Sequence, residues 1–200
     1  MVIVIDPQIA GISGDMLLSS LVNLGADKNK IIEGIIKSQK FLSDSTIKKM
    51  DFQKIQKQGI ESTELILEID ENVSKRKGIE IKKAISDSVN ELNLTTKAKT
   101  FTELCISTLI SSESKIHGIS EDSVHFHEAS SIDTLVDIVG TAIALDDLRL
   151  FEEKIVCLPV SVGGGTVSFS HGTMSNPASA VLQIFKNSNL NIQGNNSKEE

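Results

Sequence analysis

Residues 132–148 constrain the fold most, because apolar side chains recur there at the spacing of an α-helix. The pattern predicts a helix over about residues 131–148 that turns one apolar face into a hydrophobic core. That face carries Leu135, Ile138, Val139, Ala142 and Leu145. Hydrophobic residues make up 40% of the 200 residues, which is enough for the chain to bury this face in a core of its own.

Shorter patterns on both sides of this segment predict a mixed α/β fold, in which a short sheet packs with about six helices. The apolar run Val2–Ile5 predicts a buried first strand, and two strand-like stretches within residues 50–70 predict a hairpin. Two more strands are expected over residues 154–159 and 166–169. The other helices are expected over residues 16–24, 27–40, 79–93, 96–116 and 176–186. The order of the strands does not follow from these patterns.

The length and the periodicity predict one domain over residues 1–186. Residues 187–200 are rich in Asn, Ser and Glu and show no periodicity, which predicts a polar, disordered tail. The sequence does not fix the oligomeric state, so a homo-oligomer stays open.

The composition argues against several classes of function. A net charge of −7 disfavours nucleic-acid binding, which needs a basic surface, and the chain has no Trp or Tyr to stack on bases. No run approaches the roughly 18 apolar residues of a membrane span. Cys105 and Cys157 stand apart in apolar surroundings, as expected of small buried side chains in a reduced, cytoplasmic protein.

The densest group of chemically active side chains lies just before and inside the long predicted helix. His125 and His127 stand two residues apart, so their imidazoles share one face of an extended strand. Glu128 follows, and Asp133 and Asp137 share one helix face because four residues separate them. Two imidazoles with carboxylates suit a borderline ion such as nickel, zinc or iron better than calcium or magnesium. The alternative is a solvated loop followed by carboxylates that stabilise the start of the helix.

The first predicted strand runs into a glycine-containing loop that is a candidate phosphate site. Asp6 ends the strand, and Gly11, Ser13 and Gly14 lead to Asp15 at the start of the next helix. Backbone N–H groups at a helix start attract phosphate, and a cation that bridges to the phosphate would explain the two carboxylates. The alternative is a tight strand-to-helix turn in which Ser13 or Asp15 caps the helix.

A second glycine-rich loop consists of Gly163, Gly164 and Gly165, which would let the backbone approach a phosphate or nucleotide closely. His171 follows this loop and could supply a third imidazole to a metal site. A histidine directly before a glycine is more often a turn residue, so that alternative stays open as well.

Three motifs follow one another along the chain. The first is Asp6-Pro7 with G-I-S-G-D-M at 11–16, and the second is V-H-F-H-E at 124–128 with D-T-L-V-D-I-V-G at 133–140. The third is L-P-V-S-V-G-G-G-T-V at 158–167 with His171-Gly172. In this order and spacing they resemble the LarC family, the nickel-insertion proteins of the lactate racemase maturation system. The resemblance covers about residues 1–186, which correspond to the N-terminal part of the family's proteins.

The resemblance implies a nickel chelatase of the lyase class. Such proteins insert Ni²⁺ into pyridinium-3,5-bisthiocarboxylic acid mononucleotide, using CTP with Mg²⁺ or Mn²⁺, to give the nickel-pincer nucleotide cofactor. The implied partners are this mononucleotide and a C-terminal domain on the same or a separate chain. Transferred to this sequence, the metal-handling residues are His125, His127, Glu128, Asp137 and His171, and the two glycine loops bind phosphate or nucleotide.

Two other functions stay open on the sequence alone. One is a non-enzymatic nickel or nucleotide binding module that acts with a separate C-terminal domain, and the other is a metal-dependent hydrolase. A chelatase must bring the ion and its acceptor within bonding distance. We therefore predict that a carboxylate oxygen of Asp6 or Asp15 lies within roughly 10–12 Å of the imidazole of His125 or His127, a span that holds one mononucleotide.

Overall fold

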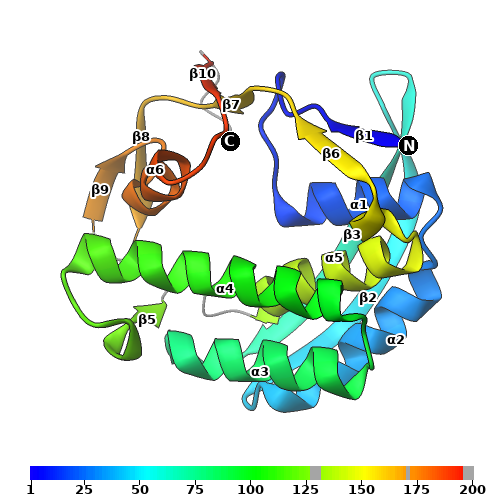
Figure 1. The fold of residues 1–200 in the computed structure, drawn as a ribbon, viewed down its shortest axis with the longest axis horizontal. Coiled ribbons are helices and arrows are strands. Elements are labelled where there is room, and N and C mark those ends of the chain that lie inside the picture. Colours follow the sequence, from blue (N-terminus) through cyan, green and yellow to red (C-terminus); the bar gives the residue numbers. More distant parts are fainter. Residues whose placement is uncertain (127–131, 170–171, 196–200) are drawn as a thin grey trace.

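The computed structural model describes residues 1–126, 132–169 and 172–195. Six α-helices occur within these ranges (Figure 1). They are α1 (Gly14–Leu24), α2 (Lys28–Ser38), α3 (Gly78–Glu91), α4 (Thr96–His117), α5 (Ile132–Asp147) and α6 (Ser179–Lys186). Each begins and ends within three residues of its predicted bounds, so the mixed α/β prediction with about six helices is confirmed.

Ten strands pair two by two within the described ranges, which gives five two-stranded sheets in place of one short sheet. β1 (Val2–Ile5) runs parallel to β6 (Lys154–Cys157), and β7 (Val160–Val162) runs parallel to β10 (Ile192–Gly194). The antiparallel pairs are β2 (Ser45–Lys57) with β3 (Ile60–Glu71), β4 (Arg76–Lys77) with β5 (His125–Phe126), and β8 (Thr166–Phe169) with β9 (Gly172–Ser175).

Helix α5 is the centre of the core. It contacts α1, α2, α3 and α4, and ten of its residues are buried. Of the predicted inward face, Leu135, Val139, Ala142 and Leu145 are buried and Ile138 packs against the core from a half-buried position. A helix that is covered on nearly every side must be apolar around most of its circumference, as this one is. The prediction that this face packs into the core is confirmed.

We expect Leu135→Ala to lower the free energy of unfolding by about 2–5 kcal/mol, because the fully buried side chain would leave a cavity. Leu24, at the end of α1, is 61% exposed, and its replacement by alanine should cost no more than about 0.5 kcal/mol. Urea unfolding of both variants measures the difference. Equal losses would contradict the central place of α5 in the core.

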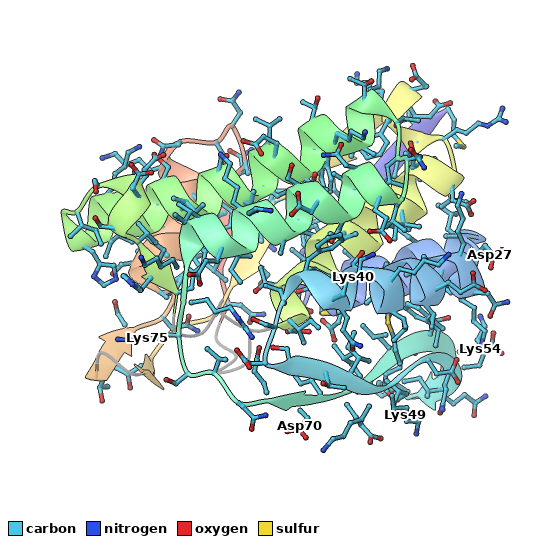
Figure 2. The ribbon with its side chains drawn as sticks, turned by 90° about the horizontal axis from the view of Figure 1, so that it is seen from below. Asp27, Lys40, Lys49, Lys54, Asp70 and Lys75 are labelled. Carbon is cyan, nitrogen blue, oxygen red and sulfur yellow. The ribbon has the colours of Figure 1, made fainter. Side chains whose placement is uncertain are left out.

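The β2–β3 hairpin packs against the helices with one face only. Ile47, Met50 and Phe52 of β2 are buried there, and β3 places aliphatic residues opposite them. Figure 2 shows the hairpin on one side of the molecule and α3 and α4 on the other, with Lys49 and Asp70 pointing away from the helices. The predicted hairpin is confirmed, and its inner face is one wall of the site described below.

The prediction of a buried first strand is wrong. β1 is not buried, because its only neighbour within the described residues is β6 and Val2 and Val4 are each 57% exposed. An apolar run is typical of a doubly covered strand, but the pattern cannot tell how many neighbours the strand will find. Within the predicted polar tail, residues Ile192–Gly194 form β10, which pairs with β7. Residues 196–200 lie outside the described ranges.

Candidate functional site

An open cleft of about 540 Å³ lies where the start of α1 and the first turns of α5 face strand β3. One wall is polar and carries three carboxylates, and the opposite wall is aliphatic. The polar wall consists of Ser13, Gly14, Asp15, Asp133 and Asp137. The aliphatic wall consists of Leu65, Leu67 and Ile69, which are half-buried and alternate along β3.

Helices α1 and α5 are in close contact at Gly14 and Asp137. A Cβ atom built on Gly14 would lie 2.1 Å from the carboxyl carbon of Asp137. No side chain fits in that space, so only glycine lets the start of α1 reach the Asp137 carboxylate. The structure thus explains why residue 14 is a glycine, and the phosphate-binding role expected of Gly14 stays a prediction.

The pKa of Asp137 is raised to about 7, mainly because the side chain is desolvated and further because Asp133 and Asp15 are close. The pKa of Asp133 is raised as well, by desolvation and by the carboxylates of Asp15 and Glu71. The Oδ1 atom of Asp137 is buried and has no hydrogen-bond partner among the described residues. Carboxylates of like charge in one cleft favour either a shared proton or a bound cation.

The start of α1 does not follow the simple capping alternative. Ser13 is the N-cap residue, but its hydroxyl donates to the carboxylate of Asp15 and makes no hydrogen bond to the helix backbone. Asp15 is therefore held at the cleft by its neighbour, in the first turn of a helix, where the helix dipole favours negative charge.

A hydrogen bond to the backbone fixes one ring nitrogen of His125 and leaves the other available to a ligand. It lies in β5 with its side chain exposed, and its Nδ1 atom is 2.9 Å from the carbonyl oxygen of Ser123. A carbonyl can only accept, so Nδ1 donates this hydrogen bond, and in the neutral ring Nε2 presents a lone pair. Protein ligands to metal ions commonly show this arrangement, in which the second ring nitrogen is fixed by a backbone carbonyl.

The other predicted metal residues, His127, Glu128 and His171, lie outside the described residues. The predicted distance between the N-terminal carboxylates and the imidazoles therefore stays a prediction.

A chain of contacts connects His125 to the carboxylate end of the cleft. β5 pairs with β4 through Arg76 and Phe126, Arg76 binds Glu71, and Glu71 accepts a hydrogen bond from the backbone N–H of Ile132 at the start of α5. Asp133 follows directly in the sequence.

Several predicted phosphate residues lie away from this cleft. Asp6 accepts a hydrogen bond from the backbone N–H of Gln8 and does not line the cleft. Gly11 has a positive φ of 73° and lies against the carbonyl oxygen of Ser161, so it serves the packing of the loop on β7. The structure thus separates Asp6 and Gly11 from Asp15, although the three are neighbours in sequence.

The second glycine loop is also apart from the cleft-lining residues. Gly163 is buried, whereas Gly164 and Gly165 are exposed and have no heavy atom within 4 Å of a built Cβ. This leaves open space beside the backbone of the loop, and its role in phosphate binding stays a prediction.

Sequence reasoning missed the aliphatic wall. Leu65, Leu67 and Ile69 follow the alternation of an ordinary strand, and nothing in that pattern says that a cleft lies above them. Asp133 was noticed as a neighbour of Asp137 on one helix face, but only the fold shows that Asp15 joins the pair.

Thiolates do not contribute to the described site. Cys105 and Cys157 are free and half-buried, and burial raises the pKa of Cys105 to about 11 and that of Cys157 above its usual value. Over residues 1–126, 132–169 and 172–195, no group of three or more His, Cys, Asp or Glu side chains is arranged to hold a metal ion. A complete metal site would therefore need further ligands or a movement of side chains.

A family model described as nickel insertion protein matches residues 3–200, which is nearly the whole chain. The chain belongs to the nickel insertion protein family. The resemblance seen in the three sequence motifs is thereby confirmed. Within the described part of the chain, no helix is long and apolar enough to cross a membrane.

Curated relatives carry names that agree with this family. A pyridinium-3,5-bisthiocarboxylic acid mononucleotide nickel insertion protein of Staphylococcus saprophyticus is 36% identical over 88% of this chain and 42% of its own length. A protein of Clostridium kluyveri with the same name is 35% identical over 88% of this chain and 45% of its own. A putative nickel insertion protein of Methanopyrus kandleri is 35% identical over 96% of this chain and 46% of its own length.

The chain therefore spans less than half the length of these nickel insertion proteins. No solved structure matches the chain.

Proposed function

We propose that this chain takes part in nickel insertion into pyridinium-3,5-bisthiocarboxylic acid mononucleotide, and that the cleft between α1, α5 and β3 is where the ion meets its acceptor. The observation that carries the proposal is the convergence of Asp15, Asp133 and Asp137 on one cleft. The names of the relatives supply the substrate.

The carboxylates and imidazoles suit an ion that must be held and then released. Ni²⁺ binds imidazole nitrogen and carboxylate oxygen, but thiocarboxylate sulfur is a softer donor. The ion moves from the protein's oxygen and nitrogen ligands to the sulfur atoms of the acceptor, without a change in oxidation state. We assign the protein ligands to His125, His127, Glu128 and Asp137, with His171 as a further candidate and Asp133 and Asp15 as attracting charges.

The opposite wall suits the acceptor's flat ring. Leu65, Leu67 and Ile69 offer aliphatic surface at a spacing that a planar ring can cover. The acceptor carries negative thiocarboxylate and phosphate groups, which the carboxylates would repel in the absence of a cation. The ion therefore binds before or together with the acceptor. Its positive charge then allows the acceptor to contact the carboxylate wall and the aliphatic wall at the same time.

The remaining parts of the family's activity belong to this proposal too. CTP dependence with Mg²⁺ or Mn²⁺ follows from the resemblance, and the exposed backbone at Gly164 and Gly165 leaves room for a phosphate group. Two free cysteines without a disulfide support a reduced, cytoplasmic location.

The test is reconstitution of the purified chain with the mononucleotide and NiCl₂, with and without CTP and MgCl₂, followed by mass spectrometry of the nickel complex. We expect the His125→Ala/His127→Ala variant to lose at least about tenfold in nickel affinity or product. His117→Ala is the matched control, because His117 lies at the end of α4 beside Glu113. An equal effect of both variants would contradict the proposal.

A second function has one specific observation in its favour. The chain spans less than half the length of its relatives, which favours a module that binds nickel and acts with a separate C-terminal domain that carries out insertion. Histidine-dependent nickel binding without product in any mixture would support this binding module. Product formed by the chain alone would exclude it.

A further inference from the structure

A partly buried carboxylate, Glu71, joins three parts of the chain beside the cleft. Its Oε1 atom accepts hydrogen bonds from Ser45 Oγ at 2.6 Å and from Arg76 at 2.6 Å. The same atom accepts the backbone N–H of Ile132 at 3.2 Å, so it caps the start of α5 from the end of β3. Glu71 is also one of the charges that raise the pKa of Asp133.

Its partner Arg76 is almost completely buried, with only 6% of the side chain exposed. The guanidinium donates to the carbonyl oxygen of Ser43 at 3.0 Å and to the hydroxyl of Ser45. The backbone of Arg76 belongs to β4 and lies opposite Phe126 of β5. The backbone N–H of Gly78 donates to the carbonyl oxygen of Val124 at 2.9 Å, which ties the same two segments together a second time.

The pair thus holds both described residues that bracket His127 and Glu128 in the sequence. Phe126 comes before them and is held through β4, and Ile132 comes after them and is held by Glu71. A buried ion pair is a costly way to fill a core, since well-packed apolar residues often stabilise as much or more. Its directional hydrogen bonds, in contrast, fix geometry.

We propose that Glu71 and Arg76 are positioning residues for nickel binding, which set Phe126 and Ile132 in place and so hold His125 of β5 in a fixed position relative to Asp133 at the start of α5. This inference rests on the proposed function, because it assumes that His125 binds nickel. Residues outside a metal's own ligand set commonly act in this way by orienting the ligands.

The experiment compares variants at the two ends of α5. Glu71→Gln removes the charge at its start. Asp147→Asn removes a comparable anchor at its end, where Asp147 accepts from the backbone N–H of Asp27 at 3.0 Å and from Lys30 at 2.9 Å. Nickel affinity is measured by titration, the visible spectrum of the bound ion at saturation, and stability by urea unfolding.

We expect Glu71→Gln to weaken nickel binding about tenfold or more and to change the spectrum of the bound ion. Asp147→Asn should leave affinity and spectrum unchanged, even where it destabilises the fold as much. Equal affinities and identical spectra for the two variants would overturn the inference.

Glu71→Gln leaves Arg76 without its full partner and could prevent folding, so a milder variant is needed. Ser45→Ala removes one hydroxyl that links both members of the pair and should cost only about 1 kcal/mol. We expect it to weaken nickel binding by a smaller but measurable factor of about two to five. Unchanged affinity in Ser45→Ala would then count against the inference.

The outcome is separable from that of the proposed function. If His125→Ala/His127→Ala leaves nickel binding unchanged, the proposed ligands are wrong. If that variant loses nickel while Glu71→Gln and Ser45→Ala retain it, only the positioning role is wrong.

Discussion

Asp137→Asn is expected to stabilise the protein at pH 8 and to weaken nickel binding. In the folded state the pKa of Asp137 is raised to about 7 from an ordinary value of 3.8, chiefly by desolvation. The folded protein therefore holds this proton more tightly than the unfolded chain does. By linkage, the free energy of unfolding falls as the pH rises from about 4 to about 7.

The full shift would correspond to about 4 kcal/mol, at 1.36 kcal/mol for each pKa unit. Because the cleft is open to water, we expect the change in unfolding free energy to be roughly half of that value, about 2 kcal/mol. Asparagine keeps the shape of the side chain and cannot ionise. The variant should therefore match the natural chain near pH 4 and exceed its stability by about 2 kcal/mol at pH 8.

Asp147→Asn, on the same helix, should change the free energy of unfolding at pH 8 in the opposite direction. The pKa of Asp147 is lowered by the backbone N–H of Asp27 and by Lys30, so this carboxylate stabilises the fold above its ordinary pKa. The asparagine variant should lose stability at pH 8. Urea unfolding at pH 4, 6 and 8 measures both variants. An Asp137→Asn protein that is less stable than the natural chain at pH 8 would contradict the account of the cleft.

Gly14→Ala is expected to have the largest effect of any single added methyl group at the site. The new Cβ would lie 2.1 Å from the Asp137 carboxyl carbon, far inside contact distance. Either α1 moves away from α5 or Asp137 leaves its place, and overpacking of this kind costs about 1–3 kcal/mol. We expect the unfolding free energy to fall by that amount and its dependence on pH between 4 and 7 to weaken, because a displaced Asp137 is no longer desolvated.

Gly164→Ala is the control, since no heavy atom lies within 4 Å of its built Cβ. It should change the unfolding free energy by no more than about 0.5 kcal/mol. Thermal unfolding at two pH values compares the two variants. If Gly14→Ala were as stable as Gly164→Ala, Asp137 would not occupy the position that the structure gives it.

The local elements could be predicted from the sequence because each has its own periodicity. The apolar repeat within 132–148 specified α5 and its inward face, and two alternating stretches specified the β2–β3 hairpin. β1 was assigned wrongly, because its apolar run does not record that β6 is its neighbour on one side only. β10 was missed because its pairing with β7 depends on contacts about 30 residues away, and not on a pattern of its own.

The candidate site was predicted in pieces and assembled only by the fold. Asp137 was predicted as a metal ligand and Asp15 as a phosphate-loop residue. The structure puts both on one cleft, because Gly14 lets α1 approach α5 across more than 100 residues of sequence. A contact between residues so far apart leaves no periodic pattern in the sequence. The same holds for Glu71, whose part in capping α5 spans 61 residues.

We infer that nickel binds at the cleft between α1, α5 and β3 with His125 of β5 among its ligands, and NMR of the ¹⁵N-labelled chain during addition of NiCl₂ tests this inference. High-spin Ni²⁺ is paramagnetic, so it broadens the amide signals of residues close to it. We expect the signals of residues 13–15, 125–126 and 133–137 to be lost first and those of 65–69 soon afterwards, while the middle of α4 is unaffected. Loss centred on His117 or on residues 187–195, or no selective loss at all, would contradict it.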